Sequence, residues 1–290
     1  MKSLRGLGVA LVTPFDVNGK IDFVALLKLL KHTADNGVDY WVVMGSTGEA
    51  ITLTEEEQEE VLQFVLKNNP TQLPIIFGLG GSNTSGLVNR LQKLDLSGVT
   101  AILSSSPAYN KPTQQGIIAH FNQIANNSPI PVILYNVPGR TCSNMDASTT
   151  LSLANHPNII AIKEASGNLN QVEDIIKGAP DGFMLTSGDD MLTSAITSLG
   201  GIGTISVLAN ALPNQFSNMV KIALSGDVNT SAHIERSLQE ISNLMYVEGN
   251  PTGLKELLAQ QGICTNNVRL PLLPATHELK MAIQLAIVKL

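Results

Sequence analysis

The chain has only two cysteines, Cys142 and Cys264, and they lie far apart in the sequence. Such a pair provides neither a zinc-binding spacing nor the framework of a disulfide-rich fold. Two free thiols are typical of a reducing compartment. The cysteine content therefore favours a cytoplasmic protein without a structural metal.

Blocks of basic charge and long apolar runs are missing as well. The formal net charge is −6 at pH 7, and no lysine and arginine cluster forms a polybasic patch, which argues against nucleic-acid and membrane partners. No apolar run reaches the ~20 residues of a membrane-spanning helix. The first apolar run has the length of a strand and is too short for a signal-peptide core. We expect a soluble protein of the cytoplasm.

Short apolar segments instead alternate with amphipathic ones along the chain, and 43% of the 290 residues are hydrophobic. We expect strands near residues 6–14, 39–44, 74–78, 99–103, 131–135, 159–163, 182–186 and 201–207. Helical patterns follow at residues 22–34, 84–96, 113–126, 146–154 and 169–177. Three further helices are expected: one that begins at residue 54, one that ends at residue 199 and one that begins at residue 213. Eight such units predict a parallel (β/α)8 TIM barrel of the α/β class. A doubly wound open sheet is the alternative.

The strand patterns stop after residue 225. Residues 228–246, 253–259 and 276–289 have helical patterns. We therefore expect a barrel catalytic domain at residues 1–225 and a C-terminal helical region at residues 226–290. This region would cover the flank of the barrel or contact another subunit.

One expected strand ends in a lysine, Lys163. The period of two in a strand places Lys163 on the same face as Ala161 and Ile159, with Ile162 on the opposite face. Inside a closed barrel, burial would lower the pKa of the ammonium, and the neutral amine could form a Schiff base with a ketone or aldehyde. The ordinary alternative is a lysine that reaches solvent or pairs with Glu164.

Polar and small residues recur where the expected strands end. In a TIM barrel these ends meet at one face, where the active site lies. The residues are Thr13, Gly45-Ser46-Thr47-Gly48-Glu49, Tyr109, Tyr135, Arg140, Lys163, Ser187-Gly188-Asp189 and Ser206.

Each of these residues also has an ordinary structural explanation. The glycine-rich segment at 45–48 lacks the Gly-Lys-Ser/Thr ending of a phosphate-binding P-loop and could be a simple turn. Tyr135 is typical of a core aromatic, and Arg140 of a surface cation. Asp189 and Asp190 suit a helix N-cap and its neighbour. Their shared position favours a common site.

Three segments of the sequence resemble the motifs of a known enzyme family. Gly45-Ser-Thr-Gly-Glu49, Tyr135-Asn-Val-Pro-Gly-Arg-Thr141 and Ile162-Lys-Glu-Ala-Ser-Gly-Asn168 resemble the dihydrodipicolinate synthase branch of the pyruvate-dependent class I aldolase superfamily. The resemblance extends over nearly the whole chain and includes Ser187-Gly-Asp-Asp190 and Gly203-Thr-Ile-Ser206.

This resemblance implies a Schiff base between Lys163 and the ketone carbon of pyruvate. Tyr135 would relay protons while the imine forms and becomes an enamine, which attacks the aldehyde of aspartate 4-semialdehyde. A hydroxyl of the glycine-rich loop, here Ser46, would connect Tyr135 to a second tyrosine. That tyrosine corresponds to Tyr109, which in the family reaches across a subunit interface.

Four further residues would bind the substrates. The family pattern implies that Thr47 holds the pyruvate carboxylate and that Arg140 binds the carboxylate of the semialdehyde. Gly188 and the carbonyl of Ile205 would complete the pocket. The resemblance implies no metal or organic cofactor, and a homotetramer built as a dimer of dimers.

The chain departs from the family pattern in two places. Many synthases carry threonine where this chain has Ser46, and serine keeps the hydroxyl but loses the methyl that restricts its rotamer. Feedback-inhibited synthases bind lysine through polar residues at the dimer interface. The corresponding positions here are Glu55, Gln58, Ser82, Gly86 and Ala108. We therefore expect weak or absent inhibition by lysine.

Two other functions remain open at this point. One is a related Schiff-base aldolase that cleaves N-acetylneuraminate or a 2-keto-3-deoxy sugar acid. Arg140 argues against it, because lyases of neutral-tailed sugar aldehydes do not place an arginine there. The other is a catalytically silent barrel that binds a small acid, which the joint presence of Lys163, Tyr135 and Tyr109 disfavours.

Overall fold

The computed structural model of the chain describes residues 4–290, so residues 1–3, which open the expected barrel domain, lie outside it. Eight parallel strands form a closed barrel in chain order. They are β1 (Gly6–Ala10), β2 (Tyr40–Val43), β3 (Ile75–Gly78), β4 (Ala101–Ser105), β5 (Val132–Asn136), β6 (Ile159–Glu164), β7 (Met184–Ser187) and β8 (Gly203–Ser206). The last strand pairs with the first through Gly8 and Ile205. This closure confirms the predicted TIM barrel and rules out the open doubly wound sheet.

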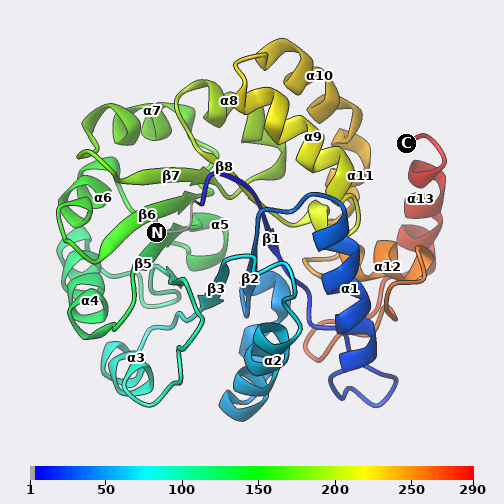
Figure 1. Cartoon of the computed structure of the whole chain (residues 1–290), viewed down its shortest axis with the longest axis horizontal. Coiled ribbons are helices and arrows are strands. Elements are labelled where there is room, and N and C mark those ends of the chain that lie inside the picture. Colours follow the sequence, from blue (N-terminus) through cyan, green and yellow to red (C-terminus); the bar gives the residue numbers. More distant parts are fainter. Residues whose placement is uncertain (1–3) are drawn as a thin grey trace.

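Helices surround the barrel (Figure 1). They are α1 (Phe23–Asp35), α2 (Glu55–Lys67), α3 (Thr84–Leu91), α4 (Gln114–Asn127), α6 (Ala147–Ala154), α7 (Leu169–Gly178), α8 (Thr193–Ser198) and α9 (Pro213–Leu224). Several begin at the side-chain caps that their sequences provide. At the start of α2, for example, Thr54 and Glu57 form a complete capping box.

Two apolar layers explain why the strands are apolar on both faces. In β1, Leu7 and Val9 point outward into the layer between strands and helices. Ala10 points inward and packs with Val42 and Ile133 in the barrel interior. Because both faces of each strand are buried, the sequence shows apolar runs instead of polar alternation.

The pairing of β5 with β6 contains one irregularity. Val132 pairs with Ile159, whereas the next residue of β5, Ile133, pairs with Ala161. A register shift of this kind moves side chains to the opposite face. Ile159 therefore packs in the outer layer, and Ala161 packs in the interior. The prediction that Ile159 shares a face with Lys163 was wrong.

Two predicted elements, the first strand and the third helix, are shorter than expected. Strand β1 ends at Ala10, because the N–H of Val12 donates to the side chain of Asn210 at 3.1 Å. Helix α3 ends at Leu91, after which Leu94 and Leu96 both enter the core. Residues two positions apart lie on different faces of a helix, so a turn is needed there.

The C-terminal part of the chain contains α10 (Val228–Ser237), α11 (Gln239–Leu244), α12 (Thr252–Gln260) and α13 (His277–Ile287). The single helix predicted at residues 228–246 is thus two helices that meet at Leu238. Helix α10 packs on α8 and α9. Helices α12 and α13 lie beside one another at one flank of the barrel (Figure 1). Within residues 4–290, no helix has the length and apolarity needed to cross a membrane.

The barrel interior leaves no room for a side chain at Gly8. A Cβ there would lie 2.1 Å from a ring atom of Tyr40, whose side chain is fully buried. We expect Gly8→Ala to lower the free energy of unfolding by about 1–3 kcal/mol, the usual cost of overpacking a core. Urea unfolding measures this change. Gly81→Ala is the matched control, because its Cβ would meet nothing closer than 3.7 Å. Equal stability of the two variants would contradict the proposed packing.

Candidate active site

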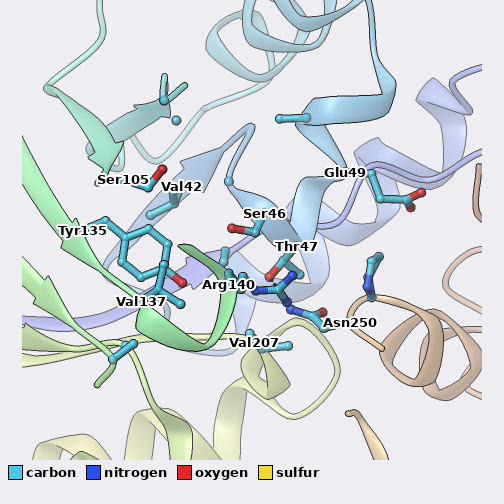
Figure 2. A pocket seen from close by; sticks show the side chains of 18 of the residues that line it. Val42, Ser46, Thr47, Glu49, Ser105, Tyr135, Val137, Arg140, Val207 and Asn250 are labelled. Carbon is cyan, nitrogen blue, oxygen red and sulfur yellow. Dashed lines mark hydrogen bonds between the residues drawn. The ribbon is translucent and has the colours of Figure 1, made fainter. Parts of the chain in front are cut away.

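A cavity of about 880 Å³ opens at the carboxyl ends of the barrel strands. Residues from the loops after most strands line it, together with residues of the C-terminal part of the chain. The cavity wall includes six of the predicted site residues, namely Ser46, Thr47, Tyr135, Arg140, Lys163 and Gly188. Figure 2 shows Tyr135, Ser46, Thr47 and Arg140 around one hollow, with Asn250 beside them. The structure therefore brings these residues, which lie far apart in the sequence, to one place.

Lys163 reaches the cavity from inside the barrel. Its side chain is 4% exposed. Glu164 follows it on β6, and the alternation of strand side chains directs that carboxylate to the outer layer, away from the lysine. Glu164 instead accepts hydrogen bonds from Asn136 and Gln171. The two ordinary explanations of Lys163, access to bulk solvent and pairing with Glu164, are both wrong.

The environment of Lys163 favours its neutral form. Burial lowers the pKa of the amine to about 8, an effect that the nearby Arg140 reinforces and the carboxylate of Asp190 opposes. A pKa near 8 leaves a useful fraction of nucleophilic amine at neutral pH. The amine nitrogen lies 4.6 Å from the centre of the Tyr135 ring, and the two residues pair directly between β5 and β6.

Gly188 is required for this arrangement. It follows β7, and a Cβ at this position would lie 2.9 Å from Cε of Lys163 and 2.8 Å from Cβ of Ala165. Contacts this short are not tolerated in proteins, so a side chain here would displace the lysine. The glycine lets the backbone pass directly against the side chain of Lys163.

Tyr135 keeps its proton at neutral pH. Burial raises the pKa of the phenol, while the positive charge of Arg140 and a hydrogen bond with Ser46 lower it in part. A protonated phenol beside an amine can donate a proton and take it back. The predicted proton relay would begin at this contact with Ser46.

Two short segments after β2 and β5 position the polar residues. Ser46, Thr47 and Gly48 form a 3-10 turn, η1 (Ser46–Gly48), whose Gly48 carbonyl accepts a hydrogen bond from Thr13 at 2.7 Å. Helix α5 (Pro138–Thr141), absent from the predicted elements, begins with a proline and carries Arg140. A proline at the first position sets φ for a helix without losing a needed N–H.

Two predicted site residues do not line the cavity. The side chain of Ile205 packs in the barrel interior, which is compatible with the expected role because only its carbonyl was assigned. Tyr109 is 94% exposed and has a positive φ of 71°. Within this chain, Tyr109 is not brought to Tyr135. Its predicted role depends on a second subunit.

Asp190 interacts with Lys163, which its position in the sequence did not indicate. Asp189 does cap the following turn, η3 (Asp190–Leu192), by accepting from the N–H of Met191 at 2.9 Å. Asp190 points elsewhere and accepts from the N–H of Leu208 at 2.8 Å. Burial raises the pKa of this carboxyl to about 6. Its charge acts on Lys163, and only the fold brings the two residues together.

The described part of the chain has no cluster of side chains suited to a metal ion. Among residues 4–290, no group of three or more His, Cys, Asp and Glu side chains is arranged to hold a metal ion.

Comparisons with known proteins agree with these features. The model of the dihydrodipicolinate synthetase family matches residues 3–289. A 4-hydroxy-tetrahydrodipicolinate synthase from Parabacteroides distasonis is 46% identical, over 94% of this chain and 92% of the relative. Solved structures of dihydrodipicolinate synthases are similar over nearly their whole length. The one from Bacillus anthracis has a TM-score of 0.96 at 35% identity and covers 100% of this chain and 99% of its own. The one from Acinetobacter baumannii, complexed with pyruvate, has a TM-score of 0.95 at 32% identity and covers 99% of each chain. The chain belongs to the dihydrodipicolinate synthetase family.

Proposed function

We propose that the chain condenses pyruvate with aspartate 4-semialdehyde to give 4-hydroxy-tetrahydrodipicolinate, a step of the diaminopimelate route to lysine. The observation that carries this proposal is the buried amine of Lys163 beside the phenol of Tyr135 inside the closed barrel. The curated relatives are named for the same reaction.

The first half of the reaction forms the enamine. The neutral amine of Lys163 attacks the ketone carbon of pyruvate, and the C–N bond forms as the carbonyl oxygen takes protons and leaves as water. Tyr135, which holds its proton, supplies one to that oxygen. The phenolate of Tyr135 then takes a proton from the methyl group, which gives the enamine and restores the phenol. Thr47, buried in the turn after β2, binds the pyruvate carboxylate through its hydroxyl and backbone N–H.

The second half joins the two substrates. The methylene carbon of the enamine attacks the aldehyde of the semialdehyde, and Tyr135 returns a proton to the new alkoxide. The amino group of the second substrate then attacks the imine carbon and displaces Lys163, which closes the ring and frees the enzyme. One water is lost overall. Arg140, at the mouth of the cavity, binds the carboxylate of the semialdehyde with its planar fork.

Completion of the proton relay calls for a second subunit. Tyr109 projects into solvent with a left-handed backbone, a conformation that costs a non-glycine residue energy. Next to the cavity, Ile51 is 95% exposed. An interface that covers both residues would carry the Tyr109 phenol to the partner's cavity. We therefore propose an oligomer, with the homotetramer implied by the family resemblance as its form, and a cytoplasmic location supported by the two free cysteines.

The alternative functions receive less support. Arg140 lines the cavity, where a neutral sugar tail would leave its charge without a partner. A silent small-acid-binding barrel would not need a buried lysine with a lowered pKa.

Reduction with borohydride in the presence of pyruvate tests the reactive group. We expect the chain to gain the mass of one reduced pyruvate, located on Lys163. The initial rate of adduct formation should rise with pH and level off above about 8, because the pKa of Lys163 is lowered to about 8 and the neutral amine is the nucleophile. Peptide mass spectrometry over a pH series measures both. Lys163→Ala is the control. A modified Lys163→Ala chain, or an unmodified native chain, would refute the mechanism.

Replacement of Arg140 separates the synthase from the sugar-acid aldolase. Arg140→Ala removes the partner of the semialdehyde carboxylate, and the loss of such a charge-assisted contact should lower kcat/KM by about 30- to 300-fold. Pyruvate trapping on Lys163 should remain. A coupled assay with aspartate 4-semialdehyde beside a panel of sugar aldehydes measures the effect. Faster turnover of a sugar aldehyde by the native chain would favour the alternative function.

Inhibition by lysine should be weak or absent. The amide of Gln58 already donates to the carbonyls of Ala50 and Leu53, and its oxygen accepts from Arg90 at 2.8 Å. Glu55 lies 3.8 Å from the same arginine. These groups are engaged with one another, so few remain for a zwitterion. Initial rates should keep more than half of their value in millimolar lysine. Stronger inhibition would contradict this expectation.

A further inference from the structure

The loop that carries Ser46 and Thr47 ends in an unusual residue. Glu49 has a left-handed backbone, with φ 54° and ψ 32°, which is strained for a residue with a side chain. Its carboxylate is also buried, with 2% of the residue exposed. A strained backbone and a buried charge persist only where the surroundings hold them. The partners of Glu49 therefore determine the shape of this loop.

Those partners come from the far end of the chain. The amine of Lys255, in α12, lies 2.5 Å from one oxygen of Glu49, and both side chains are almost completely buried. The backbone N–H of Arg269 donates to the other oxygen at 3.0 Å. Both oxygens of the carboxylate are thus occupied by residues more than 200 positions downstream.

The amine of Lys255 has two further contacts besides Glu49. It donates to the carbonyl of Asn267 at 2.8 Å and lies 4.0 Å from the centre of the Phe15 ring. A cation above an aromatic face is stabilised where water is excluded. Lys255 therefore has a fixed position, from which it can fix Glu49.

A second contact links the same two parts of the chain. The side-chain amide of Asn250, which precedes α12, donates to the hydroxyl of Thr47 at 3.0 Å. In Figure 2, Asn250 lies next to Thr47 at the edge of the hollow. The loop after β2 is thus held by the C-terminal part of the chain at two of its residues.

Lys255 itself does not line the cavity, whereas Glu49 and Thr47 do. Its contact with the cavity wall runs through Glu49. We propose that Lys255 is a positioning residue, which through its ion pair with Glu49 holds the Ser46–Thr47 loop in the conformation that binds the carboxylate of the keto acid. This inference rests on the proposed function, in which Thr47 binds pyruvate. It assigns the C-terminal helices a part in substrate binding besides covering the barrel.

The experiment measures the pyruvate concentration that gives half-maximal borohydride trapping on Lys163, together with thermal unfolding of the full-length chain. Lys255→Met removes the amine and leaves the Glu49 carboxylate buried without a cation, so we expect both stability and pyruvate binding to fall. The half-saturating pyruvate concentration should rise by about tenfold or more, the effect of one charge-assisted contact. Trapping at saturating pyruvate should change much less, because Lys163 is untouched.

A double variant separates positioning from stability. Lys255→Met with Glu49→Gln leaves no unpaired charge, and the amide oxygen can still accept from the N–H of Arg269. We expect its unfolding temperature to return toward the native value while the half-saturating pyruvate concentration stays at least about fivefold raised, because the link to α12 is still absent. This variant also decides the matter if Lys255→Met alone does not fold.

The matched control is Lys289→Met, which removes an ion pair with Glu240 that is more than half exposed on both sides. Exposed pairs contribute little, so it should change neither measurement. Native pyruvate binding in Lys255→Met or in the double variant would overturn the positioning role alone. A native chain that forms no adduct on Lys163 would overturn the proposed function and this inference with it.

Discussion

The exclusion of water from one amine is the constraint on which the rest of this structure depends. A lysine inside a barrel loses its hydration, and the cost of a buried charge falls only when the group is neutral or paired. Both effects act on Lys163. Burial lowers its pKa and so favours the neutral amine, whereas the negative charge of Asp190 favours the protonated form. An open sheet could not enclose the amine in this way. The pairing of β8 with β1, which closes the barrel, is therefore needed to keep the amine of Lys163 buried.

Contacts in the outer layer of the barrel hold the strands that carry Tyr135 and Lys163. Tyr135 and Lys163 pair across β5 and β6, and the next residues on the two strands, Asn136 and Glu164, pair as well. Strand alternation turns this second pair outward. There the carboxylate of Glu164 accepts from Asn136 at 3.0 Å and from the N–H of Ser166 at 2.6 Å. A buried carboxylate of β6 that is bonded to Asn136 of β5 opposes slippage of the two strands, so the inward pair stays in register.

Much of the fold followed from the sequence, because eight apolar segments separated by amphipathic ones have few packing solutions. The exceptions have physical reasons. Ile159 was assigned to the wrong face because the register shift opposite Val132 breaks the period of two. The helix α5 was missed because four residues carry almost no periodic signal. Six of the eight expected site residues line one cavity, since strand ends of a parallel barrel converge.

The sequence by itself determined the strand order, the residue types at the strand ends and the lysine available for a Schiff base, because local periodicity and motif spacing are properties of neighbouring residues. Only the tertiary structure decided which charges meet. Asp190 interacts with Lys163, and Lys255 and Arg269 bind the carboxylate of Glu49. These residues are too far apart in the sequence for a local pattern to pair them. The energy of a buried charge depends on the distance and dielectric between groups, and chain folding alone sets both.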